Sequence, residues 1–236
     1  MPKGPTVTKY DDEDLDDERA APLKTRLSED LFDMMFAGCT HENFPAGRHL
    51  FLQDDPADRV YGVISGTVEI AIFSMGGRKL VANMETPRSL IGEIAVLDGG
   101  RRTATASCIS DCVLVSLSRS RLFDRIERNP PLARAMIDLL CARLRWVSGE
   151  LGDQALLKIE ARLAKRLIFL TGLIGDRAGW VSISQSELAG FLGATRESVN
   201  KTLTDWRRDG LIDIKRGGLL VKKVERLEAI ANYEDD

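Results

Sequence analysis

The feature that most restricts the fold of this chain is a change in the period of its hydrophobic pattern near residue 130. Upstream of that point, short stretches such as residues 68–73 and 113–118 repeat apolar side chains at every second position. A period of two residues is typical of strands. Turn signals separate these stretches, at residues 45–47, 65–66, 76–77 and 98–100. Short strands joined by turns, with no long helix between them, predict a closed antiparallel barrel or sandwich.

Downstream of residue 130 the apolar residues fall at helical spacing. Steps of three or four separate the members of one series, which are Met136, Leu140, Leu144, Val147 and Leu151. This spacing places them in a narrow stripe along one side of a helix, and such a stripe is typical of a coiled-coil seam. It predicts a long helix that pairs with the same helix of a second chain. The alternative is that the stripe packs against the chain's own barrel.

Length and charge set limits on the organisation of the chain. Its 236 residues are enough for one or two domains with substantial cores. Residues 10–19 hold seven Asp and Glu against one Arg, which predicts a solvated acidic tail. Residues 158–231 carry fourteen Lys and Arg against nine Asp and Glu, although the whole chain has a net charge of -3. The local excess of basic residues is compatible with a nucleic-acid partner in the C-terminal part.

Several classes of protein are not indicated. The chain has no apolar run of about 18 residues and no secretory signal, which predicts a cytoplasmic location and no membrane partner. Two histidines and scattered cysteines predict free thiols, with no disulfide framework, metal or other cofactor. The cysteines are Cys39, Cys108, Cys112 and Cys141. Neither paired carboxylates nor a nucleophile with a base is present as a motif, so we do not expect an enzyme.

Residues 181–212 predict two short helices joined by a tight turn. Ser184 followed by Glu187 forms a capping box, which starts a helix. Gly193 predicts the end of that helix, because glycine adopts the left-handed conformation of a sharp turn without strain. Thr195 can cap a second helix. Its buried side is expected to contain Val199, Leu203 and Trp206. Two short helices around a glycine turn are typical of the helix-turn-helix motif that binds DNA.

The exposed side of the second helix carries polar and basic residues. Opposite the buried stripe lie Glu197, Lys201, Thr204 and Arg208. Arginine donates two hydrogen bonds to guanine and glutamate accepts one from cytosine, so Arg196 and Glu197 near the helix N-terminus are suited to base edges. The alternative is an exposed ion pair between Glu197 and Lys201.

A different group of residues, within the stretch 91–106, is suited to a small anionic ligand. Gly92 permits a close approach of the backbone to a ligand. Glu93 can accept hydrogen bonds from sugar hydroxyls, and Arg102 can make a forked contact with a phosphate. Thr103 adds a hydroxyl group. Each residue alone is a weak signal, and the group gains weight from its order and spacing.

The C-terminal part of the sequence resembles the winged helix-turn-helix of the Crp/Fnr family of bacterial transcription regulators. The match covers residues 193–212 and the hairpin that follows, whose tip carries Lys215 and Arg216 in positions suited to phosphate contacts. In the family an Arg-Glu pair reads the base edges of a TGTGA-like half-site, which the resemblance carries onto Arg196 and Glu197. The family's second recognition arginine falls at Lys201, and lysine lacks the planar fork. The resemblance further implies phosphate contacts from Ser184, Ser186, Thr195 and Ser198.

Residues 92–105 resemble the phosphate-binding cassette of cyclic nucleotide-binding domains. The family pattern is Gly-Glu-x-Ala-x-Leu, a loop of four residues, and then Arg, a small residue, Ala and Thr, which this sequence matches in order and spacing. The resemblance implies that Glu93 binds the ribose 2′-hydroxyl and that Arg102 binds the cyclic phosphate. It places the backbone amides of Ile94 and Ala95 nearby. Arg143 matches a helix arginine that supports the phosphate and the glutamate.

The resemblance leaves the base of the nucleotide open. In the family's cyclic-AMP receptors the long helix contacts the base through a Thr-Ser pair, and this chain has Val147 and Ser148 there. Ser148 keeps one hydroxyl, whereas Val147 lacks the other. Thr103 could favour a guanine base in the syn conformation. The expected effector is therefore cyclic AMP, cyclic GMP or both.

These resemblances imply an α+β fold with three structured parts. An acidic tail is expected over residues 1–27, and a jelly-roll-like antiparallel barrel that binds a cyclic nucleotide over residues 28–130. A dimerisation helix and hinge are expected over residues 131–157, followed by a winged helix-turn-helix over residues 158–236. The elements expected to move are Gly149, Gly152 and the junction at residues 156–158.

The function expected from this organisation is that of a homodimeric transcription regulator that responds to a cyclic nucleotide. It is expected to bind a palindromic site in double-stranded DNA and to contact RNA polymerase. The hypothesis for its mechanism is that ligand links the barrel to the long helix through Arg102 and Ser148. The alternative is a Crp/Fnr-type regulator that binds DNA without a ligand or senses another signal.

Overall fold

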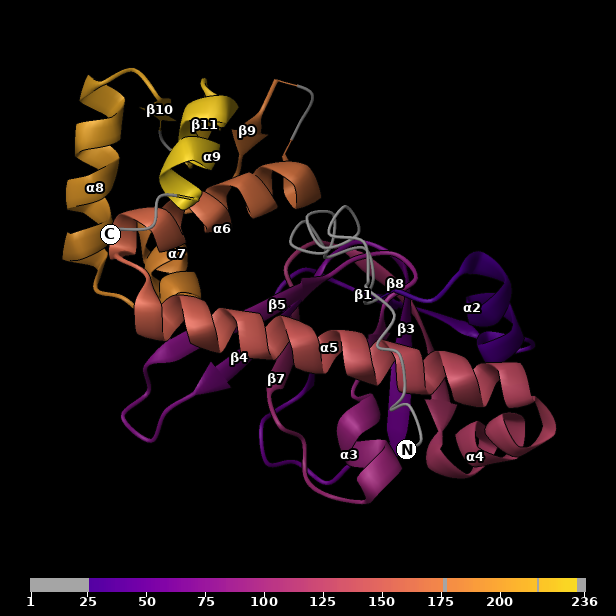
Figure 1. Ribbon diagram of the computed structural model, residues 1–236. Helices are drawn as coiled ribbons and strands as arrows, with labels where there is room; N and C mark the ends of the chain where they lie inside the picture. Colours follow the sequence, from indigo (N-terminus) through magenta and orange to yellow (C-terminus); the bar gives the residue numbers. More distant parts are fainter. Residues whose placement is uncertain (1–25, 176–177, 216, 233–236) are drawn as a thin grey trace, which may run out of the picture.

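The computed structural model describes residues 26–175, 178–215 and 217–232 (Figure 1). The acidic tail predicted for residues 1–27 therefore lies almost wholly outside the described residues. In the described part, an N-terminal barrel, a long helix and a C-terminal helical domain follow one another along the chain. The predicted α+β architecture is confirmed.

Two four-stranded antiparallel sheets form the barrel. One sheet has the strand order β1-β8-β3-β6 and the other has the order β2-β7-β4-β5. The strands are β1 (His41–Phe44), β2 (His49–Phe51), β3 (Arg59–Ser65), β4 (Val68–Phe73), β5 (Lys79–Glu85), β6 (Leu90–Ile91), β7 (Thr105–Cys108) and β8 (Cys112–Ser118). Consecutive strands such as β7 and β8 belong to different sheets, which is the double-sheet arrangement of a jelly roll.

Strand β8 is apolar on both sides because it lies between two cores. Leu114 packs in the core between the sheets, together with Val63 and Ala106. Val115 and Leu117 point the other way, into a second core formed with the helices. The alternation predicted for residues 113–118 therefore holds as a backbone period, whereas both faces of the strand are buried.

The hairpin of β4 and β5 contains a bulge on its β5 side. Ile70 pairs with Asn83 and Ala71 pairs with Val81, so the extra residue is Ala82 of β5. Strand β4 keeps a regular register against β7 from Val68 to Ala71. The alternation predicted for residues 68–73 therefore holds along the backbone, whereas Ile72 and Phe73 are both exposed at the end of the strand.

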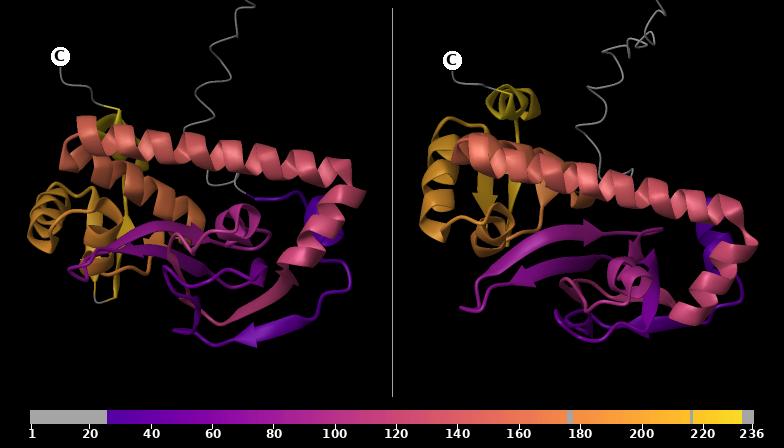
Figure 2. Two further views of the ribbon diagram at one scale, coloured as in Figure 1. Left: turned by 90° about the horizontal axis from the view of Figure 1, so that it is seen from below. Right: turned by 60° about the horizontal axis from the view of Figure 1, so that its bottom comes forward.

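Helix α5 (Pro130–Leu156) runs along the barrel from α4 (Arg119–Arg128) to the C-terminal domain (Figures 1 and 2). Its first half belongs to the helical core, where Met136 is buried and Leu140 is partly buried. Its second half exposes Leu144, Val147 and Leu151. The predicted stripe is thus divided. Its first two members pack against the chain's own barrel, which was the alternative interpretation, and the last three remain uncovered in the single chain.

The C-terminal domain combines helices with a small sheet. Its elements are α6 (Ile159–Ile174), β9 (Trp180–Val181), α7 (Gln185–Leu192), α8 (Arg196–Arg208), β10 (Ile212–Lys215), β11 (Gly218–Val221) and α9 (Val224–Ala231). The three strands pair in the order β10-β11-β9. The hairpin β10–β11 follows α8 directly, as a wing does in a winged helix-turn-helix.

The C-terminal domain is docked on the barrel. Val81 and Met84 of β5 belong to the same hydrophobic core as Leu188, Phe191 and the remaining apolar residues of the C-terminal domain. Ion pairs join the C-terminal domain to the end of α5, since Arg166 of α6 binds Glu150 and Lys165 of α6 binds Asp153 at 2.7 Å. Figure 2 shows the domain against the end of the β4–β5 hairpin and beside α5.

Among the described helices, none is both long and apolar enough to span a membrane.

Candidate functional site

The N-terminal candidate site is built around a short helix, α3 (Glu93–Asp98), that follows β6. Gly92 precedes it with φ 81°, a left-handed conformation that favours glycine. The side chain of Glu93 is buried, whereas Ile94 is exposed and Ala95 is buried again. The turn therefore directs a carboxylate inward at the point where the backbone amides of α3 begin.

Arg102 is buried beside this turn. Its guanidinium donates hydrogen bonds to the backbone oxygens of Gly92 (2.8 Å) and Arg59 (2.7 Å). It also stacks on the ring of Phe51, with 4.1 Å between the guanidinium carbon and the ring centroid. Its Nε atom is buried and has no hydrogen-bond partner among the described residues. The positively charged guanidinium of Arg102 is thus held in place by uncharged groups, and its Nε–H donor remains without an acceptor.

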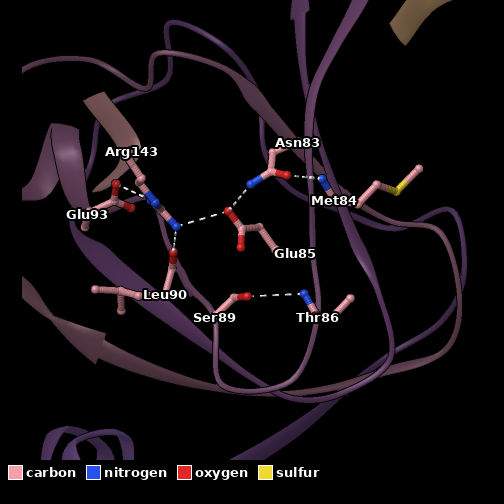
Figure 3. A network of polar contacts seen from close by, with 8 residues as sticks. All are labelled: Asn83, Met84, Glu85, Thr86, Ser89, Leu90, Glu93 and Arg143. Carbon is pink, nitrogen blue, oxygen red and sulfur yellow. Dashed lines mark hydrogen bonds and ion pairs between the residues drawn. The ribbon is translucent and has the colours of Figure 1, made fainter. Parts of the chain in front are cut away.

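Arg143 reaches the same turn from helix α5 (Figure 3). One terminal nitrogen binds the carboxylate of Glu93. The other donates to Glu85 Oε1 at 3.0 Å and to the backbone oxygen of Leu90 at 2.6 Å. Its Nε atom is also buried without a hydrogen-bond partner in the described part of the chain. Two guanidinium groups, from positions far apart in the sequence, therefore meet the segment of residues 90–93.

The electrostatics of these groups follow from burial and pairing. Burial lowers the pKa of Arg102 below its ordinary value, because no carboxylate binds it directly. Burial would lower the pKa of Arg143 as well, but the carboxylates of Glu93 and Glu85 outweigh it and raise that pKa. Burial raises the pKa of Glu85, and the charge of Arg143 opposes this rise. The arrangement can bind an anion through two arginines and accept a hydroxyl hydrogen at Glu93.

The remaining ligand-site residues from the sequence analysis lie around this centre. Thr103 follows Arg102 and is exposed. Val147 and Ser148 are exposed on α5, one turn beyond Arg143. Successive helical residues are rotated by about 100°, so Val147 shares the side of Arg143, whereas Ser148 is turned toward the exposed side that carries Leu144. The single chain does not bring Ser148 onto the face of Arg143.

The second candidate site is the outer face of helices α7 and α8. Helix α7 begins with the predicted capping box, in which Ser184 accepts a hydrogen bond from the Glu187 amide (3.1 Å) and Glu187 accepts one from the Ser184 amide (2.7 Å). Gly193 ends it with φ 59°, and Thr195 caps α8 by accepting from the Ser198 amide. These local signals are confirmed, as is the burial of the predicted stripe of Val199, Leu203 and Trp206.

The predicted base-reading residues are exposed together. Arg196 and Glu197 lie in the first turn of α8, and Lys201 follows one turn later. The predicted phosphate-contacting residues Ser184, Ser186, Thr195 and Ser198 are exposed as well. Lys215 is exposed at the end of β10, while Arg216, its predicted neighbour at the wing tip, lies outside the described residues.

Two residues of the ligand site were not predicted from the sequence. Glu85 binds Arg143 across 58 positions, and Phe51 covers Arg102. No signal in the strand marks Glu85, because the strand also holds the polar residues Lys79 and Asn83. No signal distinguishes Phe51 from a core residue. Within the described residues, no group of three His, Cys, Asp or Glu side chains is placed to hold a metal ion.

Comparison with protein families assigns both halves of the chain. Residues 41–129 match the cyclic nucleotide-binding domain, and residues 161–230 match the Crp-like helix-turn-helix domain. The first match contains Gly92, Glu93 and Arg102, and the second contains α7, α8 and the β10–β11 hairpin.

Comparison with individual proteins agrees with these assignments. The CRP-like cAMP-activated global transcriptional regulator of Mycobacterium tuberculosis is 32% identical over 190 residues, which are 78% of this chain and 85% of that protein. The cyclic AMP receptor protein of Thermus thermophilus is 29% identical and is matched over 98% of its length, which takes in 90% of this chain. Among solved structures, the c-di-GMP responsive global regulator CLP of Xanthomonas campestris has a TM-score of 0.74 at 22% identity, covering 82% of this chain and 99% of that one.

Proposed function

Because the chain belongs to the Crp/Fnr family of transcription regulators, we propose that it is a homodimer whose binding to DNA responds to cyclic AMP or cyclic GMP. The proposal assigns the barrel of residues 28–130 to the nucleotide, the helix and hinge of residues 131–157 to dimerisation, and residues 158–236 to DNA. RNA polymerase is the further partner that a regulator of this kind requires at a promoter.

The observation that carries the proposal is the meeting of Arg102 and Arg143 at the segment of residues 90–93. Each guanidinium has a buried Nε atom without a hydrogen-bond partner in the described structure. Buried donors are normally satisfied, and an unsatisfied one is costly. An anionic phosphate would supply the missing acceptors, and the carboxylate of Glu93 would take a ribose hydroxyl.

The exposed side of α5 supports the proposal of a homodimer. Large apolar side chains remain uncovered over more than half of their area along this stripe, and they are Ile137, Leu144, Val147 and Leu151, with Leu156 uncovered as well at the end of the helix. An exposed apolar stripe of this kind marks an interaction surface. Paired with its own copy, α5 would cover the stripe and present Ser148 to the partner chain.

The two exposed recognition surfaces of such a dimer would read a palindromic site. Helix α8 presents Arg196 and Glu197 for base edges, and Ser184, Thr195 and Lys215 surround them for phosphates. Two copies related by twofold symmetry would contact half-sites about one DNA turn apart. Lys201 would make a single contact where the family has a bidentate arginine.

Ligand would act by favouring one arrangement of the two domains. A ligand shifts such an equilibrium only by the difference in its affinity for the two arrangements. Helix α5 is continuous through Gly149 and Gly152, and the backbone turns extended at Leu157 and Lys158. This junction, rather than the two glycines, is the place where the proposed hinge would bend.

Calorimetric titration of the full chain with cyclic AMP and with cyclic GMP tests the ligand. We expect binding by the wild type and a loss of about tenfold or more in Arg102→Ala, since a charge-assisted contact is removed. Arg101→Ala is the matched control, because Arg101 is exposed and donates to the backbone oxygen of Asp54 instead. Equal affinity in Arg102→Ala would place the ligand elsewhere.

A DNA-binding titration with and without nucleotide separates this proposal from the alternative regulator. The alternative binds DNA without a ligand or responds to another signal. We expect nucleotide to strengthen binding to a palindromic TGTGA-like site. Tight and specific binding that ignores both nucleotides would favour the alternative.

A further inference from the structure

Glu85 is a buried carboxylate in the ligand site that the cassette pattern does not include. It ends β5, only 4% of its surface is exposed, and it precedes the turn that leads to β6. Asn83 donates a hydrogen bond to Glu85 Oε1 at 3.1 Å, and Arg143 donates to the same oxygen at 3.0 Å (Figure 3). A buried carboxylate is costly unless it is paired, so Arg143 accounts for its presence.

Arg143 binds two carboxylates, of which only Glu93 is proposed to contact the ligand. Glu93 is the residue proposed to accept the ribose hydroxyl, so its bond to Arg143 must loosen or be shared when ligand binds. Glu85 and the backbone oxygen of Leu90 hold the opposite terminal nitrogen of the guanidinium. These two acceptors keep Arg143 in place whether or not Glu93 is engaged.

We propose that Glu85 is a positioning residue of the ligand site, which holds Arg143 directed at the incoming phosphate while Glu93 turns to the ribose. The inference rests on the proposed cyclic-nucleotide function and adds a residue to it. Preorganised donors bind an anion more tightly than donors that must first be ordered. Because phosphate and ribose are common to both nucleotides, Glu85 affects the affinity for each equally and leaves their ratio unchanged.

Calorimetric titration of Glu85→Gln and Glu85→Met with cyclic AMP and cyclic GMP tests the inference. Glutamine keeps an oxygen that can accept from Arg143 but loses the charge, so we expect an affinity about fivefold lower than that of the wild type. Methionine keeps the size of the side chain without an acceptor, and we expect a loss of about thirtyfold. The graded series distinguishes the hydrogen bond from mere filling of space.

Glu69→Gln is the matched control. Glu69 lies on the neighbouring strand β4, is 5% exposed, and pairs with Lys79 rather than with Arg143. Its replacement removes a buried glutamate from the same sheet, so nucleotide affinity should stay at the wild-type value. A melting curve shows whether Glu85→Met folds. If it does not, the inference is tested by comparing the nucleotide affinity of Glu85→Gln with that of Glu69→Gln.

A double-mutant cycle with Arg143→Gln shows whether Glu85 acts through Arg143. In the Arg143→Gln background, Glu85→Gln should cause no further loss of affinity. The inference is overturned if Glu85→Gln binds both nucleotides within twofold of the wild type, or if its loss persists in full without Arg143. If the wild type itself binds neither nucleotide, the proposed function fails first, and with it this role of Glu85.

Discussion

At the scale of single residues, the arginines proposed for ligand and for DNA stand in two different environments. Arg102 and Arg143 are enclosed by protein groups that fix their position, whereas Arg196 is exposed at the start of α8. A buried arginine is suited to one small ligand of fixed shape. An exposed arginine near a helix N-terminus is suited to a surface that approaches from outside, such as a DNA groove.

The difference between base and phosphate contacts gives a prediction for Arg196 and Lys215. Arg196→Ala should cost about 1–3 kcal/mol of discrimination at one base pair, because a bidentate contact is lost. Lys215→Ala should weaken binding to all sequences alike and reduce the salt slope by about one, because a phosphate contact is lost. Titration of a set of single-base variant sites at several salt concentrations measures both effects. A uniform loss in Arg196→Ala would show that this residue contacts phosphate instead.

Residues that match a family pattern could be singled out from the sequence, including the distant Arg143, whereas residues outside any such pattern whose role depends on distant contacts could not. Glu93 and Arg102 were identified because the cassette is a continuous pattern. Glu85 was not predicted, because it belongs to no such pattern and its partner Arg143 is 58 positions away. Nothing in the order of residues 79–85 distinguishes a carboxylate that binds an arginine from one that faces water.

At the scale of elements, helix α5 has one side packed on the barrel and one side exposed. Met136 and Leu139 face the barrel core, while Ile137 and Leu144 are exposed. Cys141 lies between the two exposed residues in sequence, at helical steps of four and three, and is itself exposed. The proposed dimer would therefore bring the Cys141 thiols of both chains close to the common axis.

Oxidative cross-linking through Cys141 tests this arrangement. In a Cys39→Ser background, mild oxidation should convert most of the protein to a covalent dimer on non-reducing gels, since cysteines with Cα atoms within about 7 Å can bridge. Cys108 and Cys112 should not compete, because both are buried and burial raises the pKa of Cys108 to about 12, which leaves little reactive thiolate. The matched control, with Cys39→Ser and Cys141→Ser together, should stay uncross-linked. A dimer in sedimentation that does not cross-link would place the interface elsewhere.

Helix ends were predictable where side chains mark them. Ser184, Glu187, Gly193 and Thr195 act within a few positions of their own place in the chain, and all four were identified correctly. The helices α2 (Glu29–Phe36) and α4 were not predicted as elements of the barrel domain. Helix α2 has a local signal that the sequence analysis did not use, since Ser28 caps it and Glu29 and Asp30 stand in its first turn. Helix α4 has no side-chain cap, and packing against β8 and α5 accounts for it.

At the scale of the whole molecule, the barrel and the C-terminal domain share a hydrophobic core. Val81 of β5 is 2% exposed and belongs to the core that contains Phe191. The sequence could not show this contact, because strand alternation reports which side of β5 is apolar but not what covers it. The docked arrangement links the stability of α7 to a strand of the ligand-binding barrel.

Hydrogen exchange of valine variants tests this link. Val81→Ala should cost about 2 kcal/mol of stability and speed amide exchange in α7, because the shared core is weakened. Val60→Ala is the matched control, since Val60 is fully buried in the core of the barrel and its helices. It should destabilise the barrel to a similar extent and leave α7 protected in the folded protein. Equal protection of α7 in both variants would mean that the two domains are energetically separate.

The continuity of α5 has a mechanical consequence. A helix of 27 residues is roughly 40 Å long. With its first half packed on the barrel, it acts as a lever arm whose far end meets the C-terminal domain. The half beyond the barrel contact is about 20 Å long, so a tilt of about 10° there moves the far end by about 3.5 Å, close to the spacing of successive base pairs. Because the C-terminal domain shares a core with β5, such a movement requires the contact between Val81 and the C-terminal domain to repack.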